Sequence, residues 1–316
     1  MRALSTVLLK KDFNLIVSLP PDRLIPTIPL RLNYLLWIED LLDLAKPIET
    51  NIVNGVDIGT GACCIYPILG AKKNDWHFTA TEADEVNFVC SQKTINQNDL
   101  LNNVTLKKVN ADSLLKGNID LETKYDFTMC NPPFFNTEDF GPKSRTLKRV
   151  DPLCPKLGGS SSLNEVAFKG GEVEFVNKLI DESQDYKLSI RYDLYLSPNF
   201  SCALHFLPPP LYRIFTTMLG FKSSISPVIA MIKKIGAKSW TKTEFCQGRT
   251  MRWAVAWTFL DNIHLEELVL QKPKKQPPLK FPIVRDNWTS KGKKYTIPTI
   301  MDSISELLNQ LEVISQ

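Results

Sequence analysis

The 316-residue sequence predicts an α/β fold, in which a doubly wound, mainly parallel sheet is covered by helices on both faces. Two observations support this prediction. Strand-like apolar runs alternate with amphipathic helical patterns from residue 52 to residue 260. Acidic and amide side chains also follow directly after several of these runs, at the carboxyl edge where open parallel sheets bind their ligands.

Hydrophobic periodicity and turn residues place the individual elements. The expected strands cover residues 52–59, 76–82, 104–109, 125–130 and 215–220, followed by an antiparallel pair at 237–245 and 251–260. The expected helices lie within residues 24–45, after a proline-rich start, and over 63–73, 85–98, 170–184, 224–236 and 301–314. Pro67 has to lie in the first turn of its helix, because that turn leaves N–H groups without partners in any case.

The composition argues against several classes of protein. The chain has no apolar run of about 18 residues, so no membrane-spanning helix is expected. Its seven cysteines form no C-x-x-C pair, and their odd number argues against a zinc site or a disulfide framework. His77, His205 and His264 are scattered without metal-ligand spacing. We therefore expect no metal and a reducing compartment.

Positive charge is concentrated in two places, although the net charge is only +4. Residues 206–316 contain 16 Lys and Arg against 8 Asp and Glu. A second basic cluster, KSRTLKR at 143–149, lies just downstream of an Asn-Pro-Pro-Phe motif. A solvated surface accounts for such a cluster equally well, but basic residues beside a candidate site fit a phosphate-bearing substrate.

A glycine-rich turn and two carboxylates suggest a nucleoside-containing cofactor. VDIGTGA (56–62) places an acid and two glycines at a strand-to-helix turn, where glycines let a ligand approach the backbone. Glu82 ends the next strand, where its carboxylate could accept from ribose hydroxyls. Asp112 follows the third strand, where it could accept from an adenine amine. NAD-binding proteins share the first two features, and surface charge accounts for either acid taken alone.

The motif CNPPFF (130–135) follows a predicted strand and suggests the chemistry. The Asn131 amide and a main-chain carbonyl beside the prolines offer two acceptors to one exocyclic amine, since neither proline has an N–H group to donate. With both hydrogens held, the nitrogen lone pair would face a methyl donor. Phe134 could stack on an unpaired or flipped base. A plain proline-rich turn is the alternative interpretation.

The order of these motifs is similar to that of class I S-adenosylmethionine-dependent methyltransferases, which have a Rossmann-like fold with a mainly parallel seven-stranded sheet. Longer stretches together resemble the methyltransferase-like 16 family: RLIPTIPLRLNYLLWIEDLL (23–42), VDIGTGACCIYPILGA (56–71), CNPPFF (130–135), GGEVEFV (170–176) and TEFCQGRTMRWAVAWTF (243–259). That family includes a bacterial 23S ribosomal RNA adenine-N6 methyltransferase. Its eukaryotic members act on U6 small nuclear RNA and on hairpins in S-adenosylmethionine synthetase messages.

The resemblance implies a role for each matching position. The expected cofactor-binding residues are Arg31, Asp57, Gly59, Gly61, Cys63, Glu82, Asp112, Ser113 and Asn131, with Arg31 on the cofactor carboxylate. The expected catalytic residues, which form the adenine pocket, are Asn131, Pro132, Pro133 and Phe134. The expected RNA-binding residues are Lys143, Arg145, Lys148, Arg149, Arg249 and Arg252. A buried structural pairing is an equally good interpretation of the last two.

The spacing of the family predicts three segments. An N-terminal helical extension covers 1–45, a methyltransferase domain covers 46–262, and a basic linker with a short helix covers 263–316. Residues 192–214 have no counterpart in the family and form an atypical insert. The resemblance implies that the N-terminal RNA-contacting segment of the family is expected to be missing, and that Asp112 stands where vertebrate members carry a lysine that can block the cofactor site.

The predicted function is S-adenosylmethionine-dependent methylation of the N6 amine of an unpaired or flipped adenosine in structured RNA. U6 small nuclear RNA and messenger RNA hairpins are the expected partners of a monomer in the nucleus, and also in the cytoplasm. A ribosomal RNA adenine-N6 methyltransferase is an alternative. A second alternative is a protein glutamine methyltransferase with the same motif, because N-P-P-[FY] sites also serve glutamine and guanine amines. A third alternative is an RNA-binding protein without turnover.

Overall fold

The computed structural model describes residues 2–21, 23–45, 52–120, 123–140, 163–186, 212–248 and 250–270, together with Thr296, Thr299 and Asp302. Residues 1–271 form one compact unit, and residues 272–316 form a second. Within the described ranges, no helix is long and apolar enough to cross a membrane. All elements that follow belong to the first unit.

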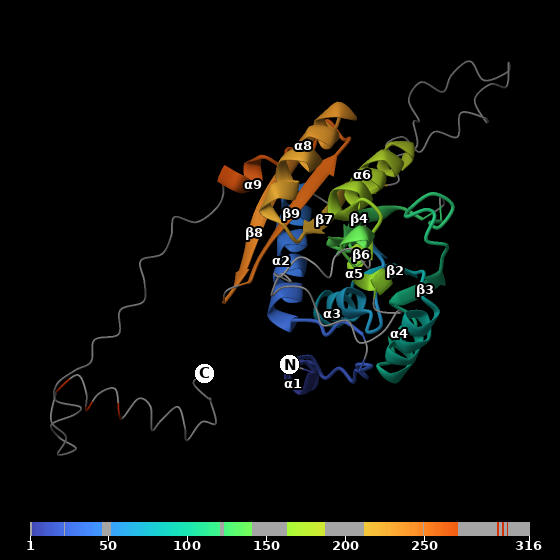
Figure 1. The fold of residues 1–316 in the computed structure, drawn as a ribbon, viewed down its shortest axis with the longest axis vertical. Helices are drawn as coiled ribbons and strands as arrows, with labels where there is room; N and C mark the ends of the chain where they lie inside the picture. The colour runs from blue at the N-terminus through green and yellow to red at the C-terminus, as the bar shows by residue number, and fades with distance from the viewer. Residues whose placement is uncertain are drawn as a thin grey trace. The chain divides into compact units, whose positions relative to one another are not determined.

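A seven-stranded sheet forms the centre of this unit (Figure 1), and its strand order is β3-β2-β1-β4-β7-β9-β8. The strands that pair in parallel are β1 (Asn54–Ile58), β2 (His77–Glu82), β3 (Val104–Lys108), β4 (Tyr125–Cys130) and β7 (Tyr212–Leu219). The antiparallel strands at one edge are β8 (Ser239–Gln247) and β9 (Thr250–Thr258). The order reverses between β1 and β4, so the predicted doubly wound, mainly parallel fold is confirmed.

Helices cover both faces of the sheet. One apolar core contains side chains of α1 (Arg2–Phe13), α2 (Ile28–Ala45), α3 (Ile65–Asn74) and α4 (Glu85–Gln97). The other contains side chains of α6 (Gly171–Ser183) and α8 (Ile225–Lys234). Side chains of β7 point alternately into the two cores, as expected for a strand that is buried on both sides.

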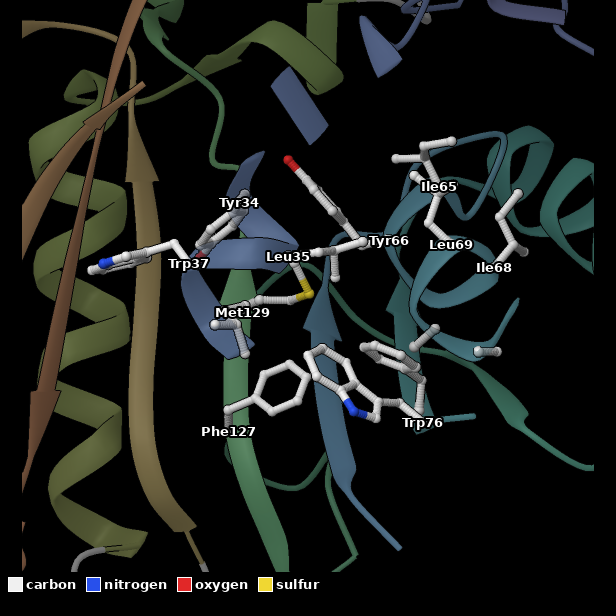
Figure 2. Packing of buried hydrophobic residues seen from close by; sticks show 14 of the residues in the cluster. Tyr34, Leu35, Trp37, Ile65, Tyr66, Ile68, Leu69, Trp76, Phe127 and Met129 are labelled. Atoms are coloured by element: carbon white, nitrogen blue, oxygen red, sulfur yellow. The ribbon is translucent and has the colours of Figure 1, made fainter. Parts of the chain in front are cut away.

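Aromatic side chains fill the core under α2 and α3 (Figure 2). The rings of Trp76 and Phe127 lie 5.1 Å apart between their centroids, and those of Tyr34 and Tyr66 meet edge to face at 5.5 Å. Large rings bury much apolar surface for each ordered side chain. This packing fixes α2 and α3 against the carboxyl half of the sheet.

Most predicted elements are present with bounds shifted by a few residues, and Pro67 lies in the first turn of α3, as expected. Residues 212–214, which the sequence analysis assigned to the insert, form the start of β7, where Tyr212 pairs with Tyr125 at the start of β4. Residues 192–211 lie outside the described residues, as does the predicted helix 301–314 apart from Asp302. The structure gives the bounds of α1 within the predicted helical extension and adds a small sheet of β5 (Phe135–Asn136) and β6 (Ala167–Phe168).

Candidate functional site

A cavity of about 570 Å³ lies at the carboxyl ends of β1, β2 and β4, where the strand order reverses. This volume falls in the usual range for small-molecule sites. The predicted residues that line it are Arg31, Gly59, Gly61, Cys63, Glu82, Ser113, Asn131 and Pro133. Seven of the nine predicted cofactor-binding residues, Asn131 among them, and two of the four predicted catalytic residues therefore share one cavity wall.

The turn after β1 forms the floor of the predicted cofactor site. Gly59 and Gly61 both have φ of +70°, a region that side chains with a Cβ rarely adopt. A Cβ built on either glycine would meet no atom within 4 Å, so open space adjoins this backbone. The turn is tied to β2 by two bonds, from Thr60 N to Thr81 O at 2.9 Å and from Gly61 N to Glu82 Oε2 at 2.8 Å.

Glu82 lines the cavity from the end of β2. Its two oxygens accept from the backbone N–H groups of Gly61 and Asp84, both at 2.8 Å. Burial raises the pKa of this carboxyl, and the N–H groups of Asp84 and Gly61 oppose that rise. An ionised carboxylate has about four acceptor positions, so capacity remains for ligand hydroxyls.

Asp57 is buried at 1% exposure and does not itself line the cavity. Neither of its oxygens has a hydrogen bond of acceptable geometry among the described residues. Burial, reinforced by Glu82, raises its pKa to about 7 against the lowering effects of the nearby Thr60 hydroxyl and Arg31. Asp57 therefore belongs to the buried support of the glycine turn and not to the surface that a ligand would contact.

Arg31 enters the cavity from the first turns of α2. Its Nη1 donates to the Tyr66 hydroxyl at 2.7 Å, and its guanidinium lies 5.4 Å from the centre of the Tyr66 ring. Its buried Nε has no hydrogen-bond partner in the described part of the chain. An arginine held in this way has a donor left for a carboxylate. Tyr66, which the sequence analysis missed, is thus the residue that orients Arg31.

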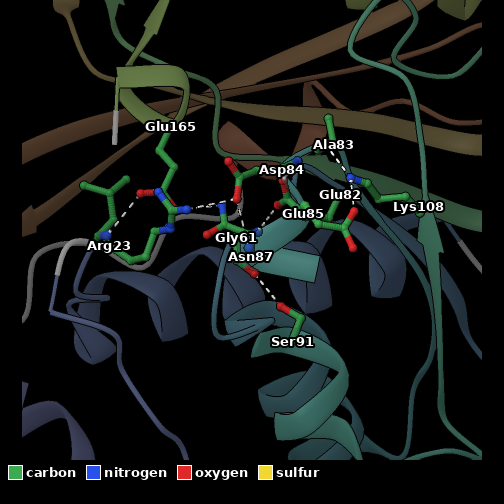
Figure 3. Close-up of polar contacts among 11 residues, drawn as sticks. Arg23, Gly61, Glu82, Ala83, Asp84, Glu85, Asn87, Ser91, Lys108 and Glu165 are labelled. Atoms are coloured by element: carbon green, nitrogen blue, oxygen red, sulfur yellow. Dashed lines mark hydrogen bonds and ion pairs between the residues drawn. The ribbon is translucent and has the colours of Figure 1, made fainter. Parts of the chain in front are cut away.

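The sequence analysis also missed polar residues of the cavity wall, Asp84, Asn87 and Glu165 (Figure 3). Glu165 accepts from Asn87 Nδ2 at 2.9 Å and from Leu24 N at 3.3 Å. Asp84 caps α4 by accepting from Asn87 N at 3.0 Å, and it also pairs with Arg23 at 3.0 Å. The sequence holds a signal for Asp84, since aspartate often precedes the first residue of a helix. It holds none for Glu165, whose partners are distant in the chain.

The Asn-Pro-Pro-Phe motif leaves β4 and places Asn131 and Pro133 on the cavity wall. The side-chain oxygen of Asn131 is buried without a hydrogen-bond partner among the described residues. An unpaired buried acceptor costs free energy unless a ligand donor meets it. Asn131 is therefore the best placed acceptor for a ligand amine. Pro132 is buried and lies outside the cavity wall.

Phe134 lies outside the cavity wall as well, against the turn after β7. A Cβ on Gly220 would fall 2.6 Å from the Phe134 ring, so only glycine allows this approach. The Arg252 guanidinium lies 5.0 Å from the ring centre, and it is half-buried. Arg252 thus pairs with Phe134 in the structure, and its contact with RNA stays a prediction.

Glu172, in the first turn of α6, holds the same turn in place. Its Oε2 accepts from Gly220 N at 2.7 Å, and the residue is 3% exposed. Burial raises its pKa to about 7, against the opposing effects of the Gly220 N–H group and of Arg252. A buried carboxyl therefore supports the ring that the sequence assigns to base stacking.

The remaining predicted residues do not join the cavity. Asp112 is exposed, and its carboxylate accepts from Asn110 Nδ2 at 3.0 Å; Asn110 lines the cavity in its place. Five predicted RNA-binding residues lie outside the described residues: Lys143, Arg145, Lys148, Arg149 and Arg249. In the part of the chain that the structure describes, no group of three His, Cys, Asp or Glu side chains could hold a metal ion.

The residues present fit the cofactor predicted from the sequence. Open space adjoins Gly59 and Gly61, Glu82 offers acceptors for ribose hydroxyls, and Arg31 has a free donor for a carboxylate. The unpaired oxygen of Asn131, on the wall of the same cavity, offers an acceptor for an amine substrate. The arrangement can bring a nucleoside cofactor and an exocyclic amine together away from bulk water.

Comparison with known proteins places the chain among RNA methyltransferases. Residues 1–199 and 211–261 match a family model described as RNA methyltransferase. The chain is 40% identical over 293 residues to RNA N(6)-adenosine-methyltransferase METTL16 of Homo sapiens, covering 90% of this chain and 47% of the relative. It is 34% identical over 266 residues to U6 small nuclear RNA (adenine-(43)-N(6))-methyltransferase of Drosophila melanogaster, covering 82% and 78%. The chain spans about half the length of the vertebrate relatives.

Solved structures agree with these sequence matches. The human METTL16 catalytic domain in complex with MAT2A 3'UTR hairpin 1 has a TM-score of 0.65 and 39% identity, over 83% of this chain and 80% of that one. The N-terminal domain of human METTL16 in complex with SAH has a TM-score of 0.62 and 38% identity, over 82% of both chains. The structural similarity and the sequence similarity therefore both identify RNA methyltransferases as the relatives of this chain.

Proposed function

We propose that this chain transfers a methyl group from S-adenosylmethionine to the N6 amine of an adenosine in structured RNA, because it belongs to the family of RNA methyltransferases whose model it matches. One observation supports the proposal above all. The unpaired acceptor of Asn131 shares a cavity with the open glycine turn and with Glu82. An amine acceptor and a nucleoside site are the two parts that such a transfer requires.

The residues of the chain position the reactants and hold their hydrogens. S-adenosylmethionine, when bound, supplies an already activated methyl group, so positioning replaces a strong general base. Glu82 would hold the ribose, and Arg31 the carboxylate. Asn131 and a neighbouring carbonyl would hold the amine hydrogens, which leaves the nitrogen lone pair free. Phe134, supported by Arg252 and Glu172, would stack on the base.

The relatives suggest the RNA. The name of the Drosophila melanogaster relative specifies U6 small nuclear RNA, and the human METTL16 catalytic domain was solved in complex with a MAT2A hairpin. We extend both to this chain as candidate substrates, in which the target adenosine is unpaired or flipped. We further propose that the chain acts as a monomer without a metal, in the nucleus and also in the cytoplasm. Sedimentation and fractionation would test these additions.

Methyl transfer to a defined hairpin tests the proposal. The full chain is incubated with radiolabelled S-adenosylmethionine and a U6-like hairpin that contains UACAGAGAA, and the digested RNA is analysed for N6-methyladenosine. Asn131→Ala should lower the rate at least about 100-fold, because it removes an acceptor aligned with the reacting amine. Asn102→Ala, at an exposed position, is the control and should keep the full rate. Equal labelling by all three proteins would contradict the assigned site, and the absence of label from the wild-type chain would contradict the substrate.

A further inference from the structure

The Asn110–Lys116 loop follows β3 and forms one wall of the cavity. Asn110, Ala111, Ser113 and Leu114 line the space. The loop belongs to no helix or strand, so sheet bonding does not fix its shape. Its conformation must instead come from the element against which it packs.

That element is the last turn of α6, through the carboxylate of Glu182. Its Oε2 accepts from three consecutive backbone N–H groups: Leu114 at 3.0 Å, Leu115 at 2.7 Å and Lys116 at 3.1 Å. The Ser113 hydroxyl, which donates to the Lys116 carbonyl at 2.6 Å, lies 3.3 Å from the same oxygen, and Leu114 N also reaches Oε1 at 3.2 Å. Successive N–H groups that converge in this way form a nest for an anion. Here a side chain of the protein fills the nest.

Two further side chains contact the loop. Lys178 of α6 donates to the Asp112 carbonyl, and Tyr186, in the 3-10 helix η4 (Gln184–Tyr186) that follows α6, donates its hydroxyl to the Leu115 carbonyl at 2.8 Å. Residues four apart lie on one face of an α-helix, so Lys178 and Glu182 share one face of α6. Lys178 and Tyr186 donate to backbone carbonyls of the loop, and the Glu182 carboxylate accepts from its backbone N–H groups. The three side chains therefore satisfy both acceptors and donors of the loop backbone.

We propose that Glu182 is a positioning residue for the nucleoside part of the cofactor, because it fixes the loop that presents Ser113 and Leu114 to the cavity. The inference rests on the proposed function in that it takes the ligand to be S-adenosylmethionine. Without the carboxylate, three converging N–H groups lose their acceptor, and the loop relaxes toward water. The cavity wall then moves, although Glu182 itself does not line the cavity.

The test measures binding and loop protection in the full-length chain. Calorimetry with S-adenosylhomocysteine as the probe compares the wild type with Glu182→Ala and Glu182→Gln. The alanine variant should bind at least about tenfold more weakly, because hydrogen bonds to a charged acceptor are strong. The glutamine variant should fall between, since one oxygen can still accept from the nest. Glu174→Gln, at an exposed position of the same helix, should bind like the wild type.

Hydrogen exchange at the amides of residues 114–116 supplies a readout that needs no catalysis. Exchange should accelerate in Glu182→Ala and stay unchanged in Glu174→Gln, and the Michaelis constant for RNA should stay within about twofold. If the alanine variant does not fold, faster exchange and weaker binding in the glutamine variant support the inference. Wild-type affinity in both Glu182 variants overturns it. A wild-type chain that does not bind the probe instead contradicts the proposed function, which distinguishes the two failures.

Discussion

Glu172 is a buried acid whose ionisation should be measurable. Burial raises its pKa from 4.5 to about 7, so the folded chain binds a proton there that the unfolded chain has already released. Between these two values the stability of the folded state falls as pH rises, by up to roughly 3 kcal/mol. Glu172→Gln removes this ionisation and keeps an acceptor for Gly220 N. The variant should therefore gain stability relative to the wild type from pH 5 to pH 8.

Urea unfolding at four pH values measures that difference. Other buried acids, such as Asp57, titrate in both proteins and cancel in the comparison. Glu174→Gln on the exposed side of α6 is the control for the loss of a carboxylate from the same helix, and its free energy of unfolding should stay close to that of the wild type. A flat difference for Glu172→Gln would show that the carboxyl stays ionised beside Arg252 over the whole range.

At the scale of single residues, the sequence predicts those site residues whose chemical type and position at a strand end both indicate a role. Gly59, Gly61 and Asn131 belong to motifs at strand ends, and the structure places all three on the cavity wall. Glu165 and Glu182 were missed because they bind backbone N–H groups at distant points of the chain. Any residue supplies such a donor, so the partner leaves no trace in the sequence.

The junction between β2 and α4 depends on one aspartate that serves two partners. Asp84 caps α4 and pairs at 3.0 Å with Arg23, whose side chain is 1% exposed. Asparagine caps a helix about as well as aspartate, so Asp84→Asn removes mainly the ion pair. The buried guanidinium then lacks its counter-charge, and the free energy of unfolding should fall by about 3 kcal/mol. Denaturant unfolding at neutral pH measures this loss.

A second substitution tests the cause of that loss. Arg23→Met in the Asp84→Asn background removes the unpaired charge and keeps an apolar stem, so most of the lost stability should return. An equal or larger loss in the double variant would mean that Arg23 supports the fold through packing. The affinity for S-adenosylhomocysteine should change with the single variant, because Asp84 lines the cavity.

Helices and strands could be predicted from the sequence where the hydrophobic periodicity of a segment matches the burial of its side chains. The strands from β1 to β4 are apolar runs between helices, and each appears within a few residues of its predicted bounds. The start of β7 was placed too late, since its first residues follow a proline-rich stretch and their pairing with β4 is a tertiary property. The helical extension predicted over 1–45 came without bounds for α1, because only Ser5 and Leu9 of this helix are buried, which leaves a weak apolar pattern.

At the scale of the whole molecule, the cavity joins the N-terminal segment, four strand ends and α6 in one compact unit. A ligand that contacts so many distant segments binds only the folded chain, so it must stabilise the unit as a whole. S-adenosylhomocysteine at about one hundred times its dissociation constant should add about 2.7 kcal/mol. For a unit of this size, that corresponds to a rise in melting temperature of roughly 5–10 °C.

Two glycine variants separate this linkage from simple backbone strain. Gly61 has φ of +70° beside the cavity, and Gly236 has φ of +77° at the exposed end of α8; neither has an atom within 4 Å of a built Cβ. Alanine at either position should lower the melting temperature of the free chain by a similar amount, since the left-handed conformation costs about 1–2 kcal/mol. Only Gly61→Ala places a methyl group in the ligand space, so calorimetric scans should show the ligand-induced rise lost in Gly61→Ala and kept in Gly236→Ala. A rise that survives in both would place the ligand away from the glycine turn.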